Sequence, residues 1–142
     1  MIFIRFVVLG IFLSSCAINK KIDMSINNLE CDSFQVRVTY FPRLYFDEHA
    51  NDILNSRINK ELLTKKLLNE IHEKRKTKVI NVLLTKLLEP ENDKLNYSLL
   101  YNEDGKVNYS YNNIEWVDDD CYFSEEDIIK IKEYWLIKIN SY

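Results

Sequence analysis

Glycine and proline are scarce in this sequence, with two of each among 142 residues. A phosphate-binding loop needs several glycines close together, so the Gly-rich nucleotide sites are excluded. The Gly-x-Ser-x-Gly turn of many serine hydrolases is also absent. Because hydrophobic residues make up 46% of the chain, the scarcity of these two residues indicates a folded chain and not a disordered one.

Histidine, the most frequent general base and metal ligand, occurs only as His49 and His72. Glu70-Ile71-His72-Glu73 lacks the second histidine of the His-Glu-x-x-His zinc motif. The carboxylates of Asp118–Asp120 lack the alternating oxygens, glycine and distal glutamate of a calcium loop. We therefore expect no metal, no cofactor and no catalytic residue, although a Ser-His-Asp triad scattered along the chain would leave no local motif.

No apolar run reaches the roughly 20 residues that a transmembrane helix needs. The run from Ile2 to Leu13 is interrupted only by Arg5 and Gly10. A positive start followed by roughly 7–15 apolar residues is typical of a secretory signal peptide. The net charge of −3 gives no bias toward nucleic acid, so we expect no nucleic-acid partner.

The end of this run, Leu13-Ser14-Ser15-Cys16, resembles the lipobox of bacterial lipoproteins. The resemblance implies that residues 1–15 are a signal peptide, that Cys16 receives a diacylglycerol on its sulfur, and that the new amino end is acylated. Two or three acyl chains hold a protein stably on a membrane. Ala17, as the second mature residue, then favours the outer membrane facing the periplasm over the inner membrane. The alternative is an ordinary signal or a buried strand in which Cys16 is incidental.

Two cysteines remain after Cys16, namely Cys31 and Cys121. An exported domain with two spare cysteines favours a disulfide between them. The bridge would close a loop of about 90 residues, and a loop of that length contributes roughly 4–5 kcal/mol in the chain-entropy description. Two free thiols or a metal site are the alternatives.

Periodicity predicts the elements of the mature chain. Residues 16–30 are polar and predict a short tether, although Ile22, Met24 and Ile26 also fit an edge strand. The predicted elements that follow are a strand over 33–41 ended by Pro42, a long helix over 47–74 capped by Asp47 or Asn51, a helix over 79–88 ended by Pro90, a hairpin over 95–111, and a last helix opened by Ser124. Within 79–88, Val79, Ile80 and Val82 also fit a strand, which is the alternative for that segment.

The hairpin register follows from its turn. A three-residue loop with Gly105 left-handed sets Leu99 against Tyr109 and Tyr97 against Tyr111, which gathers the large side chains on one face. The apolar phase then slips by one residue, which predicts a bulge or corner at Asn112-Asn113. We expect the last helix to pack on this hairpin, with Ile128, Ile131, Trp135 and Ile139 as its apolar stripe.

The basic cluster Lys74–Lys78 fits the charged carboxyl end of the long helix, where cations complement the macrodipole. Contact with anionic lipid headgroups is the alternative.

Tyrosine and tryptophan are abundant, and both are favoured in protein interfaces. Tyr40, Phe41 and Tyr45 flank Pro42-Arg43, so we expect a loop here that presents aromatic side chains to a protein partner, with Arg43 as its anchor.

These observations predict an α+β fold in which a small antiparallel sheet, one N-terminal strand plus a hairpin, packs against two or three helices in the order β-α-α-β-β-α. Residues 1–15 are the expected signal peptide, 16–30 a lipidated tether and 31–142 a single domain. We expect a protein-binding module, in general style like the immunity lipoproteins or the inhibitors of envelope-attacking enzymes. A structural lipoprotein of a secretion, conjugation or outer-membrane machine is the alternative, and a small hydrolase is a third.

Overall fold

The computed structural model describes residues 16–38, 42–98, 108–112, 114–117, 121 and 123–141. Its first described element is a helix over residues 16–27, here called the N-terminal helix. The elements that follow are η1 (Cys31–Ser33), β1 (Phe34–Val38), β2 (Pro42–Phe46), α2 (Glu48–Leu54), α3 (Lys60–Asn69), α4 (Thr77–Leu88), η2 (Pro90–Asn92), β3 (Leu95–Ser98), β4 (Asn108–Tyr111), β5 (Ile114–Val117) and α5 (Glu125–Asn140).

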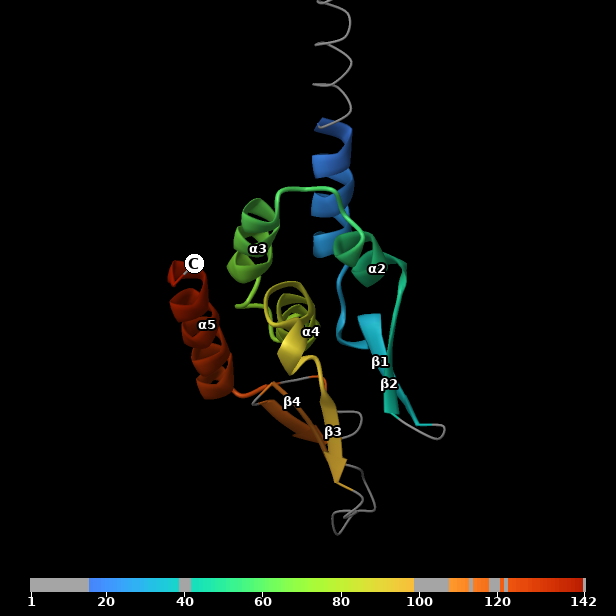
Figure 1. The fold of residues 1–142 in the computed structure, drawn as a ribbon, viewed down its shortest axis with the longest axis vertical. Coiled ribbons are helices and arrows are strands. Elements are labelled where there is room, and N and C mark those ends of the chain that lie inside the picture. The colour runs from blue at the N-terminus through green and yellow to red at the C-terminus, as the bar shows by residue number, and fades with distance from the viewer. Residues whose placement is uncertain are drawn as a thin grey trace, which may run out of the picture.

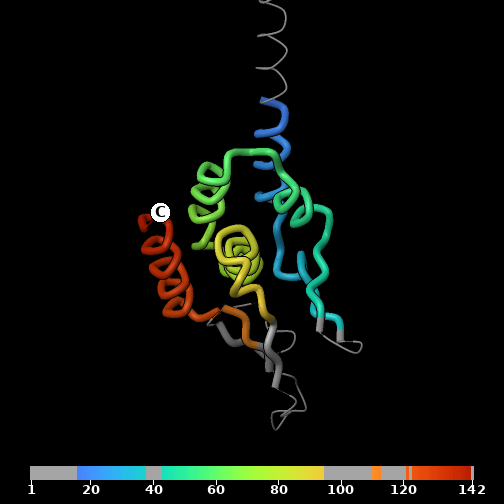
Figure 2. The backbone as a smooth tube through the Cα atoms, viewed as in Figure 1, coloured from blue at the N-terminus to red at the C-terminus, as the bar shows by residue number. Residues whose placement is uncertain are grey.

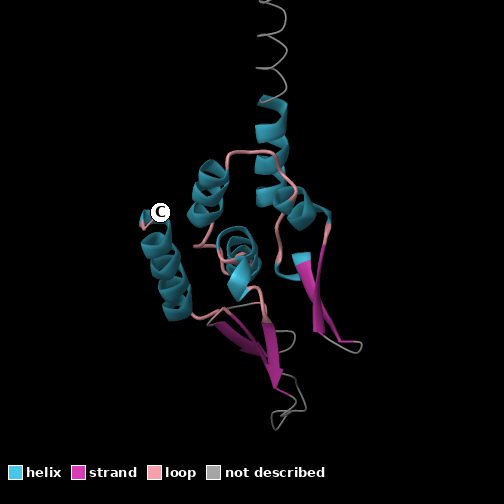
Figure 3. Ribbon diagram, viewed as in Figure 1, coloured by secondary structure: helices cyan, strands magenta, loops and turns pink. Residues whose placement is uncertain are grey.

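The predicted α+β class is confirmed, with more elements than the sequence indicated (Figure 3). The strands form two antiparallel sheets, a β1-β2 ribbon and a three-stranded β3-β4-β5 meander. The additions to the predicted order are the N-terminal helix, the strands β2 and β5, and a break in the long helix.

Helix α4 lies in the middle of the molecule, between α3 and α5 on one side and α2 with the N-terminal helix on the other (Figures 1 and 2). Every residue from Thr77 to Thr85 is buried. A helix buried on all sides carries apolar residues on every side, and here they are interrupted only by Thr77, Lys78, Asn81 and Thr85. The run of valine and leucine in this segment therefore fits strand and helix patterns equally. The prediction of a helix here is confirmed.

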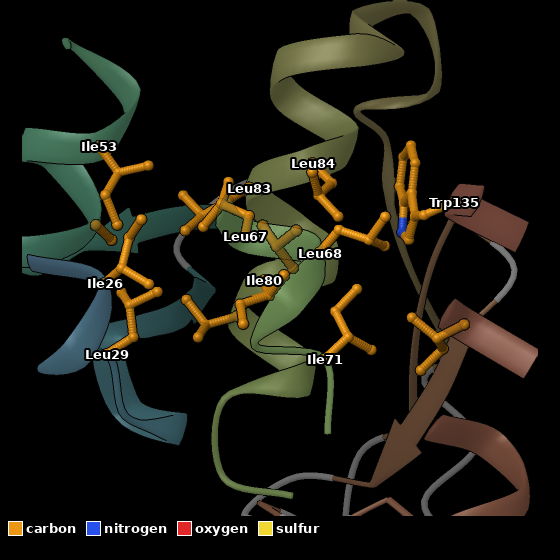
Figure 4. Close-up of a cluster of buried hydrophobic side chains, with 14 of the residues drawn as sticks. Ile26, Leu29, Ile53, Leu67, Leu68, Ile71, Ile80, Leu83, Leu84 and Trp135 are labelled. Atoms are coloured by element: carbon orange, nitrogen blue, oxygen red, sulfur yellow. The ribbon is translucent and has the colours of Figure 1, made fainter. Parts of the chain in front are cut away.

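One hydrophobic core surrounds α4, and side chains from both sides of the helix meet in it (Figure 4). Burying a side chain of this size contributes roughly 1.5–3 kcal/mol, so the core is the main source of stability. The labelled members are Ile26, Leu29, Ile53, Leu67, Leu68, Ile71, Ile80, Leu83, Leu84 and Trp135.

The predicted tether is wrong, because residues 16–27 are helical and belong to the domain. Ile22, Ile26 and Leu29 follow helical spacing and are at most 3% exposed, whereas Met24 between them is 57% exposed. Ile22 and Ile26 thus lie on one apolar face of a helix, and Met24 lies outside that face. Their alternation in the sequence does not mark an edge strand. Asp23 of this helix also accepts a hydrogen bond from Lys66 of α3 at 2.5 Å.

The predicted long helix over 47–74 is two helices, α2 and α3, and its break is explained by asparagine. Asn55 ends α2. Asn59 caps α3, and its side chain accepts hydrogen bonds from the backbone amides of Glu61 at 2.9 Å and Leu62 at 3.3 Å. Asparagine is among the best N-caps, so a new start is stabilised there. The predicted cap at Asp47 is confirmed: its carboxylate accepts the Ala50 amide at 2.8 Å.

The hairpin register differs from the prediction by two residues. Tyr97 pairs with Tyr109 and Leu95 with Tyr111, so Tyr97 does not face Tyr111. A shift of two leaves every residue on its predicted face, which is why the hydrophobic pattern could not detect it. The loop at 99–107, with Gly105, lies outside the described residues.

The bulge or corner predicted at Asn112-Asn113 is also wrong. Tyr111 pairs directly with Ile114, so the chain reverses between these residues and β5 runs back along β4. Asn112 has a φ of 46°, and asparagine is one of the few residues that adopt this left-handed conformation readily. Because Tyr109 and Tyr111 pair with Trp116 and Ile114, the large residues lie at odd positions before the turn and at even positions after it. The two-residue turn therefore accounts for the one-residue shift of the apolar pattern in the sequence.

The cap predicted for the last helix is confirmed, since the Ser124 hydroxyl accepts the Asp127 amide at 3.1 Å. Ile128, Ile131 and Trp135 of α5 are buried as expected. The expected packing on the hairpin is corrected: α5 lies against α3 (Figure 1), and its Trp135 indole donates a hydrogen bond to the Asn81 side chain of α4 at 2.7 Å.

Candidate functional site

The β1-β2 ribbon has one face in the core and one face in solvent. Phe34 is 5% exposed, and its ring centroid lies 6.5 Å from that of Phe46 on the inner face. Strand side chains alternate, so the residues between these point outward. We call this outer surface the arginine face. Its described members are Gln35, Arg37, Arg43 and Tyr45, all of them exposed.

The arginine face brings two like charges together. Arg37 and Arg43 are direct cross-strand partners, and like charges at such positions are destabilising. The Arg37 guanidinium lies 4.6 Å from the centroid of the Tyr45 ring, within cation–π distance. Neither arginine has an ion pair among the described residues of the chain. The fold therefore holds two guanidinium groups, neither paired with an acid of the described residues, and a tyrosine on one exposed surface.

This arrangement suits recognition of carboxylates on a protein. A guanidinium can bind a carboxylate through two parallel hydrogen bonds. Arginine and tyrosine are also the residues most enriched where protein interfaces concentrate their binding energy. The arginine face is the candidate binding site.

The structure only partly agrees with the predicted partner-binding loop. Arg43 and Tyr45 lie together, but on strand β2 and not in a loop, because Pro42 begins that strand. Tyr40 and Phe41 lie outside the described residues. Sequence reasoning missed Arg37. Its signal was the alternation of Gln35 and Arg37 with the apolar residues of β1, which marks the exposed side of the strand.

Cys16 lies at the outer end of the described chain, where the N-terminal helix projects from the domain (Figure 1). It is a free, exposed cysteine. Among the described residues, no helix combines the length and apolar character needed to cross a membrane.

The predicted disulfide between Cys31 and Cys121 is present, with the two Cα atoms 5.3 Å apart. Cys31 lies in η1, directly before the ribbon, and Cys121 lies in the segment between β5 and α5. The bridge therefore ties the base of the arginine face to the start of the last helix.

A buried carboxylate forms the densest polar cluster of the described chain. Glu89, just after α4, is 1% exposed. It accepts hydrogen bonds from the hydroxyl of Tyr134 at 2.6 Å and the side-chain amides of Asn112 at 3.1 Å and Asn92 at 3.2 Å. Lys138 forms an ion pair with it. These partners come from α5, η2 and the β4–β5 turn. Glu89 therefore connects the β3-β4-β5 sheet to the helices α5 and η2.

Burial acts to raise the pKa of Glu89, but hydrogen bonds from Lys138, Tyr134, Asn92 and Asn112 outweigh it and lower the pKa to about 2. The carboxylate is thus ionised at neutral pH. A general acid must carry a proton at the working pH, so Glu89 does not suit that role. Its partners assign it to holding the fold together.

The two histidines lie in separate segments, His49 on α2 and His72 in the turn after α3. His72 is exposed, its Nδ1 lies 2.7 Å from the Asn69 carbonyl oxygen, and its Nε2 lies 3.5 Å from Glu73. His49 is half-buried on α2. Within the described ranges, no three His, Cys, Asp or Glu side chains cluster so as to hold a metal ion. Asp118–Asp120 lie outside those ranges.

The basic cluster Lys74–Lys78 lies at the start of α4, so its interpretation as a helix carboxyl end is wrong. The amino end of a helix is the positive end of its dipole, so other charges must offset the cluster. Lys74 pairs with Glu125 at 3.3 Å, and Lys76 pairs with Glu70 at 3.2 Å. These cations serve contacts within the protein, which leaves less support for the lipid alternative at this cluster.

A groove of about 510 Å³ lies where the start of α3 meets the end of α5. Its walls mix charged and apolar groups. They are formed by Lys60, Glu61, Thr64, Lys65, Leu88, Ile139 and Asn140.

No family model matches the chain, and neither the curated proteins nor the solved structures contain a match to it.

Proposed function

We propose that this protein is a lipid-anchored protein of the bacterial envelope that binds a protein partner through its arginine face. The observation that carries the proposal is the pairing of Arg37 with Arg43 beside Tyr45, without an acidic partner in the described chain. An immunity protein against a secreted toxin, or an inhibitor of an envelope-attacking enzyme, is the kind of binding module proposed.

The anchor is supported by the lipobox-like Leu13-Ser14-Ser15-Cys16 and by the exposure of Cys16. The disulfide between Cys31 and Cys121 adds support, because such bonds persist in exported proteins. With Ala17 as the second mature residue, the proposed location is the outer membrane, facing the periplasm. The helix that follows replaces a flexible tether, so the lipid would hold the domain close to the bilayer.

The partner is proposed to be acidic at its contact surface. Two arginines that repel each other gain most from a carboxylate placed between them. The β1-β2 ribbon runs away from the end that carries Cys16 (Figure 1), which leaves this surface open to a partner in the periplasm.

A structural lipoprotein of a larger envelope machine is the second candidate, because α5 offers another contact surface. Ile129, Leu136 and Ile137 are 56%, 41% and 71% exposed. Their spacing of seven and eight residues places them on one side of the helix. A protein with two contact surfaces would join two neighbours, whereas an immunity protein needs one.

The test is crosslinking and affinity capture of the tagged mature protein from cells, with charge-reversed variants. We expect one stoichiometric partner with the wild type and its loss with Arg37→Glu/Arg43→Glu. The matched control is Arg75→Glu/Lys94→Glu, which makes the same charge change at two other exposed positions and should retain the partner. Retention by the arginine-face variant would refute the proposed site.

Two further readouts separate the candidates. An immunity protein should protect cells from its toxin when expressed alone, and protection should be lost with Arg37→Glu/Arg43→Glu. A machine component should instead fractionate in a large complex that Ile137→Glu disrupts. Radioactive palmitate should label the wild type but not Cys16→Ser, and equal labelling of both would exclude the lipid anchor.

A further inference from the structure

The end of the molecule around Cys16 has a charge of opposite sign to the whole chain. It comprises the N-terminal helix and residues 48–66, which together form α2, the connection to α3 and the first part of α3 (Figure 3). Lys21 of the helix pairs with Asp52 of α2 at 2.8 Å, and Asp23 pairs with Lys66 of α3 at 2.5 Å. These two ion pairs fix the helix between α2 and α3.

Cations outnumber anions at this end. It holds six, Lys20, Lys21, Arg57, Lys60, Lys65 and Lys66, against the four anions Asp23, Glu48, Asp52 and Glu61. The whole chain has a net charge of −3, whereas this end carries two more cations than anions.

Three of the four anions are already used by neighbouring lysines, the third being Glu61 with Lys65 at 2.6 Å. Lys20, Arg57 and Lys60 are exposed and have no ion pair within the described part of the chain. We call these three residues the anchor-end cations. They come from the N-terminal helix, the α2–α3 connection and the first residue of α3.

The anchor-end cations lie near Cys16, and this position determines whether they can reach a membrane surface. Lys20 follows Cys16 by four helical residues, a rise of roughly 6 Å. The ion pairs of Lys21 with Asp52 and of Asp23 with Lys66 hold the helices on either side of the α2–α3 connection against the same helix. At physiological salt, electrostatic interactions extend over roughly 8 Å. A lipid on Cys16 therefore places these charges within reach of the headgroups.

We infer that the anchor-end cations bind the headgroups of anionic phospholipids and thereby orient the domain on the membrane. This inference rests on the lipid anchor of the proposed function. The exposed apolar side chain of Ile18, 40% exposed and two residues from Cys16, fits the same contact, because interfacial helices combine cations with apolar residues that enter the headgroup boundary. The arginine face, on the ribbon that runs away from this end, stays free.

The test uses vesicles and the chain that begins at position 16, carrying Cys16→Ser so that no lipid is attached. This chain retains every described core residue, the first of which is Ile22. We expect this protein to co-sediment with phosphatidylglycerol-containing vesicles at low salt, and not with pure phosphatidylcholine vesicles. Neutralising the anchor-end cations, by Lys20→Gln/Arg57→Gln/Lys60→Gln, should weaken binding about fivefold per charge, or roughly 100-fold in total.

Two matched variants make the test specific. Arg75→Gln/Lys94→Gln/Lys130→Gln changes three other exposed cations and should bind as the wild type does. Arg37→Gln/Arg43→Gln, on the arginine face, should also retain binding. The inference is overturned if the anchor-end variant binds normally, if the arginine-face variant loses binding instead, or if anionic lipid makes no difference.

A second measurement distinguishes failure of this inference from failure of the anchor. Cys16 is a free thiol while Cys31 and Cys121 are bonded, so it can be coupled to a maleimide lipid in vesicles without any cellular acylation. The amine labelling rates of Lys20 and Lys60 should fall on anionic vesicles and recover in high salt, while that of Lys94 stays constant. Unchanged rates for all three would refute the lipid contact, whereas unlabelled cells in the palmitate experiment would refute only the natural anchor.

Discussion

At the scale of single residues, the buried carboxylate of Glu89 is bound by four described side chains, those of Tyr134, Asn112, Asn92 and Lys138. Replacing it with alanine leaves the Tyr134 hydroxyl without its acceptor and the Asn112 amide with Thr85 as its remaining one, at a partly buried site. We expect Glu89→Ala to lower the free energy of unfolding by about 3 kcal/mol. Glu89→Gln keeps an acceptor but loses the charge that Lys138 and the hydrogen bonds stabilise, so about 2–3 kcal/mol is expected.

Urea unfolding at neutral pH measures both changes. Glu91→Gln is the matched control, because Glu91 is exposed two residues away and should stay within about 0.5 kcal/mol of the wild type. A Glu89→Ala protein as stable as this control would show that the cluster contributes nothing to the fold.

The same carboxylate predicts how stability depends on pH. The pKa of Glu89 falls from its usual 4.5 to about 2 on folding, so the unfolded chain takes up its proton first as the pH falls. The stabilisation is complete above pH 4.5 and is lost between there and pH 2, about 3 kcal/mol in all. The difference in stability between wild type and Glu89→Gln should therefore shrink across this window. A constant difference in acid would show that the carboxylate has an ordinary pKa in the folded state.

Residue roles were predictable where the partners are close in sequence. The caps at Asp47 and Ser124 bond to amides three residues ahead, so a local pattern revealed them. Glu89 was missed because Asn112 and Tyr134 are 23 and 45 residues away. A glutamate at the end of a helix is usually solvated, and only the tertiary fold shows that this one is buried.

At the scale of elements, the predictions were wrong where the same residues fit both the strand period of two residues and another arrangement of the chain. Ile22 and Ile26 fit both an alternating strand and a helix turn, and only the exposure of Met24 distinguishes them. The hairpin register was wrong by two because side-chain alternation has period two, so a slip of two residues changes no facing. Element type was predictable from pattern, whereas register depends on a turn whose geometry the pattern does not fix.

The N-terminal helix gives a direct test at this scale. Ile26 is 3% exposed and Met24 is 57% exposed. Ile26→Ala removes buried volume and should cost about 2–4 kcal/mol, whereas Met24→Ala should change stability by less than about 0.5 kcal/mol. Chemical unfolding of the two variants compares them directly. If residues 16–30 were a tether, both substitutions would be equally harmless.

At the scale of the whole molecule, the candidate site could be predicted only in part. The sequence singled out Arg43 and Tyr45 because an arginine beside aromatic residues is typical of interfaces. It could not show that Arg37 opposes Arg43, because that pairing requires β2 to fold back on β1. The anchor-end cations were invisible for the same reason, since they come from three separate segments and their excess over the acids appears only once ion pairs are assigned.

The disulfide provides the last test, because it acts on the chain as a whole. Cys31 and Cys121 are 90 residues apart, and closing a loop of this size restricts the unfolded chain by about 4–5 kcal/mol in the chain-entropy description. The double variant Cys31→Ser/Cys121→Ser should therefore unfold at lower urea concentration than the wild type. Reductant should bring the wild type to the level of this variant and leave the variant itself unchanged.

Binding separates this entropic effect from damage to the site. A cross-link that acts on the unfolded state leaves the folded arginine face intact, so the double-serine variant should bind the partner with wild-type affinity under conditions where it is folded. Weaker binding by a fully folded variant would mean that the bridge also positions β1, which begins three residues after Cys31. The bridge would then be part of the binding site and not only of its stability.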